Sequence, residues 1–442
     1  MPWNVFVLGY DEFGARLFPQ LRHAADYSFH GLLPLDEAVH ADHYSISKLR
    51  EDAFRELDQF PASIDAIVSY WDFPASALAP LLRHRHGLPG PTLEAVLKCE
   101  HKYWGRVEQS RSIPDCVPGF QALDPFAEDA VSQVELDYPL WIKPVKAHSS
   151  QLGFRVDDPD ALQRVLPIIR EGIGRFGEPS EDIVRYADIP DDIATVTGHH
   201  CILESIISAG HQCTLEGYVH GGEVHVYGVV DTMRDAQQPS VLSCYIYPSQ
   251  LPATIQERMI EYTRRLMAHI GYDDAPFNVE FYHDARDDQI WLLEVNSRLS
   301  RSHAPLFLLV DGAPHLQVMV DLGLGITPRM PSGEGRYQVA AKRMVRVFHD
   351  GIVRKAPSDA EIARVEAMFP GTVVEINVRE GMRLSDLLHQ DEYSYELAVV
   401  FLGADDPRQL RERYRLCETM LPFTIEPLHA GAVEAEGTPR ET

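Results

Sequence analysis

The chain has 442 residues, of which 45% are hydrophobic and 24% charged, and this fits a globular protein of two or three domains. Its 40 Lys and Arg stand against 66 Asp and Glu, so the net charge of −26 disfavours nucleic acid and anionic membranes as partners. No segment reaches the ~18 consecutive apolar residues of a membrane span, and the N-terminus lacks the basic and apolar regions of a signal peptide. The six cysteines include no CxxC pair, so we expect a reduced, cytoplasmic protein.

Residues 1–96 are predicted to form a domain in which strands and helices alternate. An apolar strand at residues 3–10 is followed by a helical pattern at 11–21, and a strand at 62–72 by a helical pattern at 73–87. Such alternation is typical of a parallel sheet. The N-terminal region is therefore expected to be an α/β domain.

Residues 97–330 are predicted to form a larger region that mixes helices and strands. Helical patterns are expected at residues 91–114, at 253–271, and at 305–325 with a break near Gly312. Strands are expected at residues 138–145, 154–158 and 201–207, and as a pair within 213–231 that turns at Gly221-Gly222.

A Pro- and Gly-rich linker, TPRMPSGEG, precedes the last part of the chain. The pattern that follows predicts a C-terminal α+β subdomain, residues 331–428. Residues 429–442 are expected to be a disordered tail, because they are rich in small and acidic residues.

The stretch FNVEFYHDARDDQIWLLEVNSRLSRS, residues 277–302, is predicted to begin with a β-hairpin that turns at Asp287. This centre places Glu280 opposite Glu294. Alternation along each strand then puts four polar side chains on one face: Asn278, Glu280, Glu294 and Asn296. The other face, expected to meet the core, carries Val279, Phe281, Leu293 and Val295.

The opposed glutamates of this hairpin suggest a metal site. Directly paired carboxylates repel one another, so a sheet gains nothing from them alone. Mg²⁺ prefers an octahedron of oxygen ligands and shares them with substrate phosphates, and Glu280, Glu294 and the Asn296 amide oxygen would supply part of that set. The alternative is a solvated outer face, where Glu and Asn are common. Arg298, on the same face, could hold charge that develops on a transferred phosphoryl or acyl oxygen.

The run EVNSRLSRS, after a strand carrying NVE, resembles the ATP-grasp superfamily, ATP-dependent ligases that join a carboxylate to an amine through an acyl phosphate. The resemblance covers roughly residues 95–325. It implies a fold of mixed α/β and α+β class, with an N-terminal parallel βα domain, a small lid subdomain at about residues 130–203 and a large antiparallel sheet. It also implies ATP and one or two Mg²⁺, with Mn²⁺ as an alternative metal.

The resemblance assigns roles to residues in several segments. Lys102 and Lys143 look like the two nucleotide lysines, and CILESII looks like the hinge strand that reads adenine. The implied ATP-binding residues are Lys102, Lys143, Ser149, Ser150, Glu204, Ser205, Ile207 and His211. The implied metal ligands are Glu280, Glu294 and Asn296, and Arg298 is the implied catalytic residue. Arg301, Ser302 and His303 are candidate substrate contacts at the exit of the strand.

The lid loop departs from the biotin-carboxylase pattern. It reads KPVKAHSSQLGF in place of a glycine-rich loop, and neither the Arg/Gln/Lys-rich segment after the lid nor a biotin attachment motif is visible. The stretch GHQCTLEGYVHGGEVHVYGVVD and the YPSQLP that precedes a long helix look like the L-amino-acid ligase branch.

The resemblance therefore implies a ligase that joins an amino-acid carboxylate to an amine, with small-molecule substrates and no nucleic-acid or membrane partner. Two alternatives stay open, namely a carboxylase that uses bicarbonate and a nucleotide-binding subunit without ligase activity. A homodimer is an expectation from the family alone.

Overall fold

The computed structural model describes residues 2–41, 43–147, 152–207, 210–235, 238, 241–387 and 394–428. The chain divides into two compact units, one of residues 1–232 and 246–336 and the other of residues 233–245 and 337–442. The finer division expected at residues 96 and 330 stays a prediction.

The first unit begins with a small parallel sheet. Strands β1 (Trp3–Leu8), β2 (Tyr27–Leu32) and β3 (Ala66–Val68) pair in the order β2-β1-β3, all parallel. Helices α3 (Ile46–Gln59) and α4 (Ala75–His86) contribute Leu49, Leu57, Leu78 and Leu82 to the core that includes Phe6 and Ile67. The expected parallel βα domain is confirmed, although β2 and α3 were not predicted.

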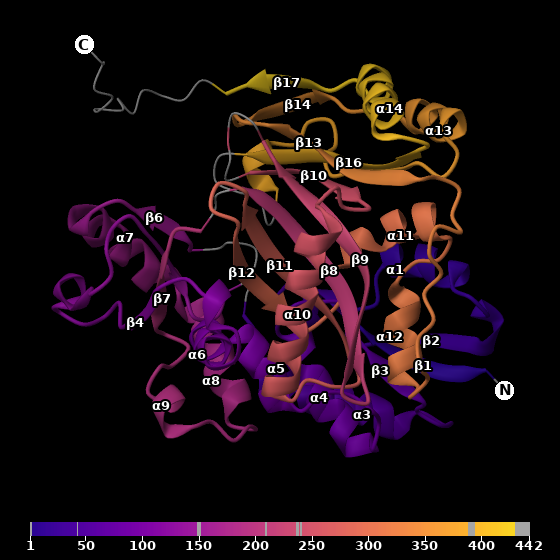
Figure 1. The fold of residues 1–442 in the computed structure, drawn as a ribbon. Helices are drawn as coiled ribbons and strands as arrows, with labels where there is room; N and C mark the ends of the chain where they lie inside the picture. The colour runs from indigo at the N-terminus through magenta and orange to yellow at the C-terminus, as the bar shows by residue number, and fades with distance from the viewer. Residues whose placement is uncertain are drawn as a thin grey trace, which may run out of the picture. The chain divides into compact units, whose positions relative to one another are not determined.

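Two helices, α5 (Leu93–Glu100) and α6 (Lys102–Ser112), lead from this domain to a second sheet. This antiparallel sheet has the strand order β4-β7-β5-β6, from β4 (Phe120–Leu123), β5 (Leu140–Pro144), β6 (Phe154–Val156) and β7 (Cys201–Ser205). Helix α7 (Pro159–Gly172) lies beside it in Figure 1 and buries Leu162, Leu166 and Ile169 in its core. Strands β5 and β6 lie within the range expected for the lid, whereas β4 precedes it, and the bounds of the lid stay a prediction.

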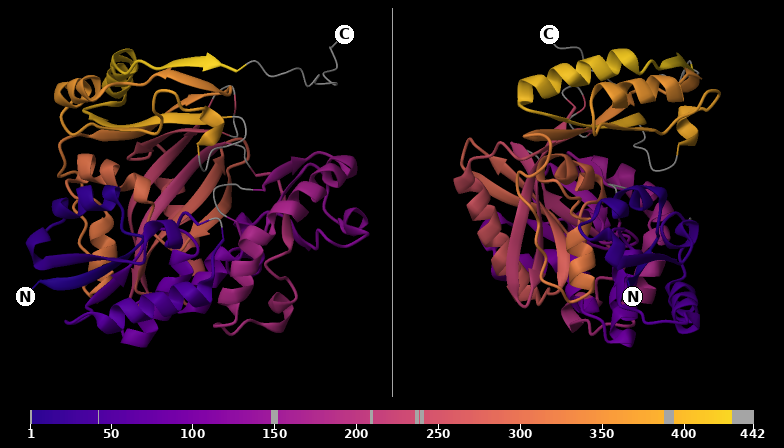
Figure 2. Two further views of the ribbon diagram at one scale, coloured as in Figure 1. Left: turned by 180° about the vertical axis from the view of Figure 1, so that it is seen from behind. Right: turned by 90° about the vertical axis from the view of Figure 1, so that its right-hand side faces the viewer.

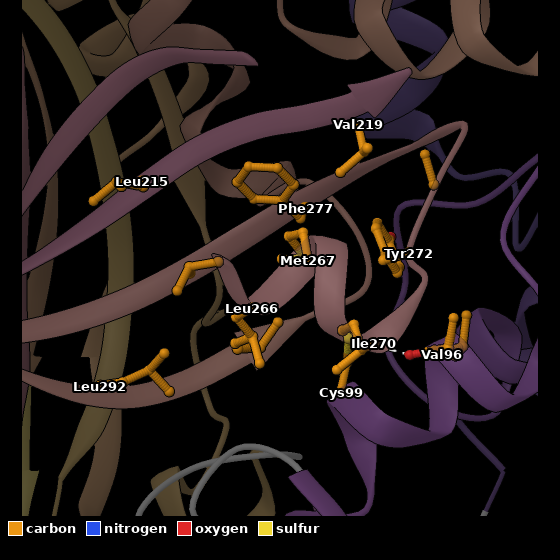
Figure 3. Close-up of a cluster of buried hydrophobic side chains, with 14 of the residues drawn as sticks. Val96, Cys99, Leu215, Val219, Leu266, Met267, Ile270, Tyr272, Phe277 and Leu292 are labelled. Atoms are coloured by element: carbon orange, nitrogen blue, oxygen red, sulfur yellow. Dashed lines mark hydrogen bonds between the residues drawn. The ribbon is translucent and has the colours of Figure 1, made fainter. Parts of the chain in front are cut away.

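The large antiparallel sheet of the first unit carries the predicted hairpin. Its order is β12-β11-β8-β9, formed by β8 (His211–His220), β9 (Glu223–Arg234), β11 (Ala275–Asp284) and β12 (Gln289–Asn296). Helix α10 (Ala253–Ile270) covers one face and ends at Gly271, whose φ of 70° is the left-handed conformation that closes many helices. Figure 3 shows this core, in which side chains of α5 and α10 meet those of the strands.

The register of the hairpin is as predicted at its open end and shifts nearer the turn. Glu280 pairs with Glu294 and Asn278 with Asn296, but Phe281 pairs with Leu292 because a bulge lies between Glu280 and Phe281. The prediction that Leu293 faces the core was wrong. Leu292 is fully buried in its place, and Leu293 is the extra residue of the bulge.

Helices α11 (Ala304–Asp311) and α12 (Leu316–Gly323) follow the hairpin and are separated by the predicted break at Gly312, whose φ is 86°. Among the described residues, no single helix is long and apolar enough to cross a membrane. One pair of segments, Arg301–Asp311 and Leu316–Gly323, passes that test only when both are taken together, and it is bent by 106°.

The second unit contains both strands and helices. Its strands run in the order β10-β13-β16-β15, and β14 pairs with β17. The bounds are β10 (Leu242–Tyr247), β13 (Val339–Val347), β14 (Gly351–Lys355), β15 (Val373–Ile376), β16 (Tyr395–Ala404) and β17 (Thr424–Pro427). In Figure 2, helices α13 (Asp359–Met368) and α14 (Pro407–Met420) lie together on one side of β13 and β16.

The remaining elements are short connections. The helices are α1 (Glu12–Leu17), α2 (Leu35–Ala38), α8 (Gly174–Val184) and α9 (Asp191–Ala194). Single 3₁₀ turns occupy Phe18–Gln20, Ala24–Asp26, Pro114–Cys116, Ala130–Gln133, Arg301–His303 and Leu384–Asp386.

Candidate active site

The paired glutamates of the hairpin lie on the face of the sheet opposite to its apolar core. Glu280 is oriented from β8, since its Oε2 accepts a hydrogen bond from Gln212 Nε2 at 3.0 Å. The Gln212 amide is itself fixed, because Tyr282 donates its hydroxyl hydrogen to Gln212 Oε1 at 2.9 Å. The Glu280 carboxylate is therefore held by a short chain of side chains.

Glu294 faces the first of the two predicted lysines. Lys102 Nζ lies 3.4 Å from Glu294 Oε1 and donates to the carbonyl oxygen of Ala147 at 2.6 Å. Burial would raise the pKa of Glu294, but the positive charges of Lys102 and Lys143 lower it below its usual value. Glu294 is thus held in its ionised form, the form that binds a metal.

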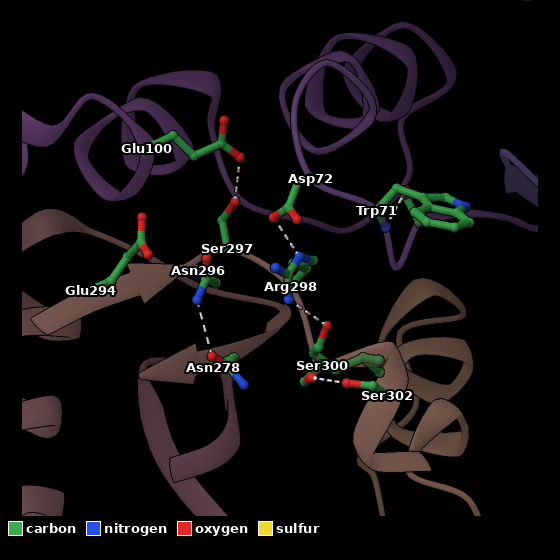
Figure 4. Close-up of polar contacts among 12 residues, drawn as sticks. Trp71, Asp72, Glu100, Asn278, Glu294, Asn296, Ser297, Arg298, Ser300 and Ser302 are labelled. Carbon is green, nitrogen blue, oxygen red and sulfur yellow. Dashed lines mark hydrogen bonds and ion pairs between the residues drawn. The ribbon is translucent and has the colours of Figure 1, made fainter. Parts of the chain in front are cut away.

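Asn296 completes the predicted ligand set. Its Nδ2 donates to Asn278 Oδ1 at 3.0 Å, which directs the Oδ1 of Asn296 away from that contact (Figure 4). No group of three or more His, Cys, Asp or Glu side chains that could hold a metal occurs within the described part of the chain. Two carboxylates and one amide oxygen fit Mg²⁺ provided that nucleotide phosphates supply further ligands.

The second predicted lysine is held in a buried ion-pair network. Lys143 Nζ, on β5, lies 2.6 Å from Glu204 Oε2 on β7, and Arg106 Nε of α6 lies 2.5 Å from Glu204 Oε1. Burial alone would raise the pKa of Glu204, but the charges of Arg106 and Lys143 lower it to about 2. The geometry makes Glu204 a support for Lys143, a role not anticipated from the sequence.

Arg106 also links this network to the bulge of the hairpin. Its Nη1 donates to the Leu292 carbonyl oxygen at 2.8 Å and its Nη2 to the Leu293 carbonyl oxygen at 3.0 Å. The guanidinium is almost fully buried. One side chain therefore joins α6, the lid strand β7 and the strand that carries Glu294.

The other predicted nucleotide residues are spread around the β7–β8 connection. Ser205 donates its backbone N–H to the Gly119 carbonyl oxygen at 2.9 Å, and Ile207 is half-buried beyond it. His211 Nε2 lies 2.8 Å from Asp231 Oδ1. Ser149 and Ser150 lie outside the described residues.

Arg298 meets a carboxylate of the N-terminal domain. Its Nε donates to Asp72 Oδ1 at 2.6 Å, and its Nη1 donates to the Leu299 carbonyl oxygen at 3.1 Å (Figure 4). Burial would lower the pKa of Arg298, but Asp72 raises it above its usual value. Asp72 follows β3, and no sequence motif marked it as part of the site.

The three candidate substrate contacts have different surroundings. Arg301 pairs through Nη2 with Asp11, and its guanidinium carbon lies 4.0 Å from the ring centre of Phe13. Ser302 Oγ lies 3.4 Å from Ser300 Oγ. His303 is only 1% exposed, so the structure places it in the interior.

A third lysine of the site, Lys146, was missed from the sequence and supports the turn that follows β12. Lys146 Nζ lies 2.5 Å from Glu100 Oε2 and 4.3 Å from the ring centre of Phe73. Glu100 Oε1 in turn accepts from Ser297 Oγ at 2.9 Å. The run KPVKAH places Lys146 three residues after Lys143, and that spacing was the only signal for it.

Comparison with known proteins agrees with the expected fold. Residues 136–303 match the family model described as an ATP-grasp domain. Over 259 residues, the chain is 26% identical to the carbamoyl phosphate synthase large chain of Rubrobacter xylanophilus. This alignment covers 57% of the present chain but only 22% of that protein.

Two solved structures resemble the whole chain. An L-amino acid ligase from Bacillus licheniformis superimposes with a TM-score of 0.69 at 16% identity, covering 96% of this chain and 99% of the other. The biotin carboxylase domain of the Hydrogenobacter thermophilus 2-oxoglutarate carboxylase, crystallised with MgADP and bicarbonate, gives a TM-score of 0.65 at 14% identity. That superposition covers 96% of this chain and 91% of the other. At these identities the likeness establishes the fold.

Proposed function

Because this chain carries an ATP-grasp domain, we propose that it is an ATP-dependent ligase that joins a carboxylate, expected to be that of an amino acid, to an amine. In the first step a carboxylate oxygen attacks the γ-phosphorus of ATP, giving an acyl phosphate and ADP. In the second step the amine attacks the acyl carbon, phosphate leaves, and a proton is released. The product is an amide.

One observation carries this proposal. Glu280 and Glu294 are paired across the hairpin, Lys102 Nζ lies 3.4 Å from Glu294 Oε1, and Lys143, from a separate segment, is near enough for its charge to lower the pKa of Glu294. A chain of net charge −26 needs such a concentration of cations to hold ATP. A solvated hairpin face, the alternative considered from the sequence, would not need two lysines from separate segments near it.

The residues of the chain would divide the work as follows. Lys102 and Lys143 would hold phosphate oxygens as point charges, with Glu204 and Arg106 keeping Lys143 in place. Glu280, Glu294 and Asn296 would hold Mg²⁺, which supplies charge neutralisation on the phosphates when it is bound. Arg298 would stabilise the acyl phosphate and the tetrahedral species that forms when the amine attacks.

The nucleotide base and the ribose would lie along the β7–β8 connection. Backbone groups near Ser205 and Ile207 would contact adenine, and His211 would contact the ribose, with Asp231 orienting its ring. The β5–β6 lid would exclude water during the reaction, so that the acyl phosphate is not hydrolysed.

The amino-acid ligase reading is favoured over carboxylation. The lid loop and the GHQCTLEGYVHGGEVHVYGVVD stretch resemble the L-amino-acid ligase branch, and the structure of one such ligase resembles the chain over nearly its full length. The sequence also lacks the biotin-associated segments. A nucleotide-binding subunit without ligase activity is less favoured, because nucleotide binding alone has little use for Arg298 beside Asp72.

An ADP-release screen over pairs of amino acids and amines, with mass spectrometry of the products, tests this function. We expect ADP release that requires both substrates and yields an amide. Glu294→Gln should abolish this turnover, whereas Glu223→Gln, at an exposed position on β9, should not. ADP release with bicarbonate alone would support the carboxylase. Nucleotide binding without any turnover would support the binding subunit.

A further inference from the structure

Glu216 is a fully buried carboxylate in the middle of β8, on the same sheet as the paired glutamates. Three donors converge on its Oε1. Asn278 Nδ2 lies at 2.7 Å, His303 Nδ1 at 2.7 Å, and the backbone N–H of Ser300 at 3.2 Å. Neither the sequence motifs nor the comparisons assign it a role.

We propose that Glu216 is a positioning residue that sets both the amide of Asn296 and the turn that follows Arg298. The proposal rests on the function proposed above, since it concerns the metal ligand and the reaction-centre arginine of that site. Glu216 itself reaches neither group. It acts through two separate sets of contacts, one for each.

The first set fixes the direction of two amides in series. Oε1 of Glu216 already accepts a hydrogen bond from the backbone N–H of Ser300, so it is the acceptor here and Asn278 must present its NH₂ group to it. The Oδ1 of Asn278 is then turned toward Asn296, from which it accepts at 3.0 Å. Asn296 must therefore use its own NH₂ group in this contact, which leaves its oxygen for the metal. Without Glu216, nothing in this series would stop either amide from rotating by 180°.

The second set holds the backbone after Arg298. The Ser300 N–H lies between the two oxygens of Glu216, at 3.2 and 3.3 Å, and His303 donates from Nδ1. His315 Nε2 donates to the Ser300 carbonyl oxygen at 2.9 Å, so both sides of that peptide group are held. The backbone is thus held in place at Ser300, two residues after Arg298.

Burying the Glu216 carboxylate costs free energy of folding, which suggests that it is kept for a function other than stability. A carboxylate taken out of water loses hydration that its partners must replace, and an apolar side chain at the same place would usually be as stable or more so. Burial raises the pKa of Glu216, while the nearby His315 and the hydrogen bonds from Asn278 and Ser300 oppose that effect. The number of donors directed at one carboxylate is the structural sign of a positioning role.

The two sets can be separated by mutation. Asn278→Ala breaks only the first, and we expect the Mn²⁺ concentration for half-maximal binding with ADP to rise about 10- to 100-fold, as is typical when a residue that orients a metal ligand is lost. Mn²⁺ binding is measured by water proton relaxation, which does not depend on turnover. Glu216→Gln retains an oxygen for Asn278 and should stay near the wild type, whereas Glu216→Leu should behave like Asn278→Ala.

A matched pair at His303 tests the second set. The side-chain NH₂ group of Asn can occupy the place of His303 Nδ1 and donate to Glu216, whereas the NH₂ group of Gln lies too far along the side chain to do so. We therefore expect His303→Asn to retain turnover and His303→Gln to lose it. Asp311→Asn is the stability control, because Asp311 is also a buried, hydrogen-bonded carboxylate of this unit, bonded to Tyr247 and Gly333. It should leave Mn²⁺ binding unchanged.

The outcomes distinguish this inference from the proposed function. Wild-type protein that binds no Mn²⁺ with ADP would overturn the proposed metal site itself. Wild-type protein that binds Mn²⁺, together with an Asn278→Ala variant of equal affinity, would overturn the positioning role while leaving the function intact.

Discussion

Asp72 and Arg298 form an ion pair of 2.6 Å between residues 226 positions apart in the chain. Asp72 comes from the end of the N-terminal parallel sheet, and Arg298 from the turn after β12. Asp72 accepts a hydrogen bond from Nε of the guanidinium, and the Leu299 carbonyl oxygen accepts one from Nη1. The orientation of the Arg298 side chain is therefore fixed by two contacts. The N-terminal domain therefore takes part in arranging the proposed reaction centre.

Asp72→Asn should lower turnover more than nucleotide affinity. The substitution removes the charge that holds Arg298, and misplacement of a catalytic group by about 1 Å can cost roughly 100-fold in rate. We expect a loss of kcat of roughly 10- to 100-fold, with the dissociation constant of ADP changed less than about threefold. The measurements are steady-state ADP release and calorimetric binding of ADP.

The control for this change is Asp58→Asn, which removes a surface carboxylate paired with Arg85 at 2.7 Å. Its kcat should equal that of the wild type, since exposed ion pairs contribute little. Equal kcat values for wild type and Asp72→Asn would mean that Arg298 keeps its position without the carboxylate.

The lowered pKa of Glu204 predicts that the stability of the protein depends on pH. Its pKa in the folded protein is about 2, below the ordinary value of 4.5. A carboxyl group of this kind adds stability that is fully present above pH 4.5 and is lost as the pH falls toward 2. The shift corresponds to roughly 3 kcal/mol of the free energy of unfolding.

Glu204→Gln isolates this contribution. The variant should be less stable than the wild type by roughly 3–5 kcal/mol near pH 7, because it leaves the buried charges of Arg106 and Lys143 without their partner. The difference in the free energy of unfolding between the wild type and Glu204→Gln should become smaller as the pH falls from 5 toward 2. Urea unfolding followed by tryptophan fluorescence at several pH values measures it, and a gap that stays constant with pH would contradict the assignment.

Arg106→Lys should destabilise the protein although it keeps the positive charge. Lysine lacks the planar fork with which Arg106 reaches Glu204 and the carbonyl oxygens of Leu292 and Leu293 at the same time. Two buried carbonyl groups would lose their donors, at about 1–3 kcal/mol each. Urea midpoints should show this loss, and Arg265→Lys, at an exposed arginine on α10, should show almost none.

The sequence was sufficient for the open end of the hairpin but not for its closed end. Alternation of Asn and Glu predicted the pairs of Glu280 with Glu294 and of Asn278 with Asn296, and the structure has both. A strict alternation cannot anticipate a bulge, which depends here on Arg106 of another helix satisfying the carbonyl groups that the bulge exposes. The error at Leu293 follows from that remote contact.

Asp72 and Glu216 were missed for a similar reason, and strand β2 for a different one. Asp72 follows an ordinary strand sequence and Glu216 lies within one, and only tertiary structure brings them to Arg298 and Asn278. Strand β2, YSFHGL, was missed because it is an edge strand with mixed polar and apolar residues and lacks the long apolar run of a central parallel strand. Motifs identify groups that perform chemistry, whereas the groups that position them have no constant spacing.

Asp321, on α12, is a carboxyl group whose ionisation opposes folding. It is 8% exposed and accepts a hydrogen bond from Gln317 Nε2 at 2.7 Å. Burial raises its pKa to about 6, and Gln317, His23 and Arg22 offset only part of that effect. The folded protein thus binds this proton more tightly than the unfolded chain, so stability should fall as the pH rises through 6.

Asp321→Asn should therefore stabilise the protein at pH 7.5 and not at pH 4. The amide cannot ionise, so the variant avoids a cost of roughly 1–3 kcal/mol that the wild type bears above pH 6. Urea unfolding at pH 4, 6 and 7.5 measures the difference, with Asp36→Asn, at an exposed carboxylate on α2, as the control that should change nothing. A variant that is less stable than the wild type at pH 7.5 would show that Asp321 is paired with a cation when it is ionised, and that burial does not control its titration.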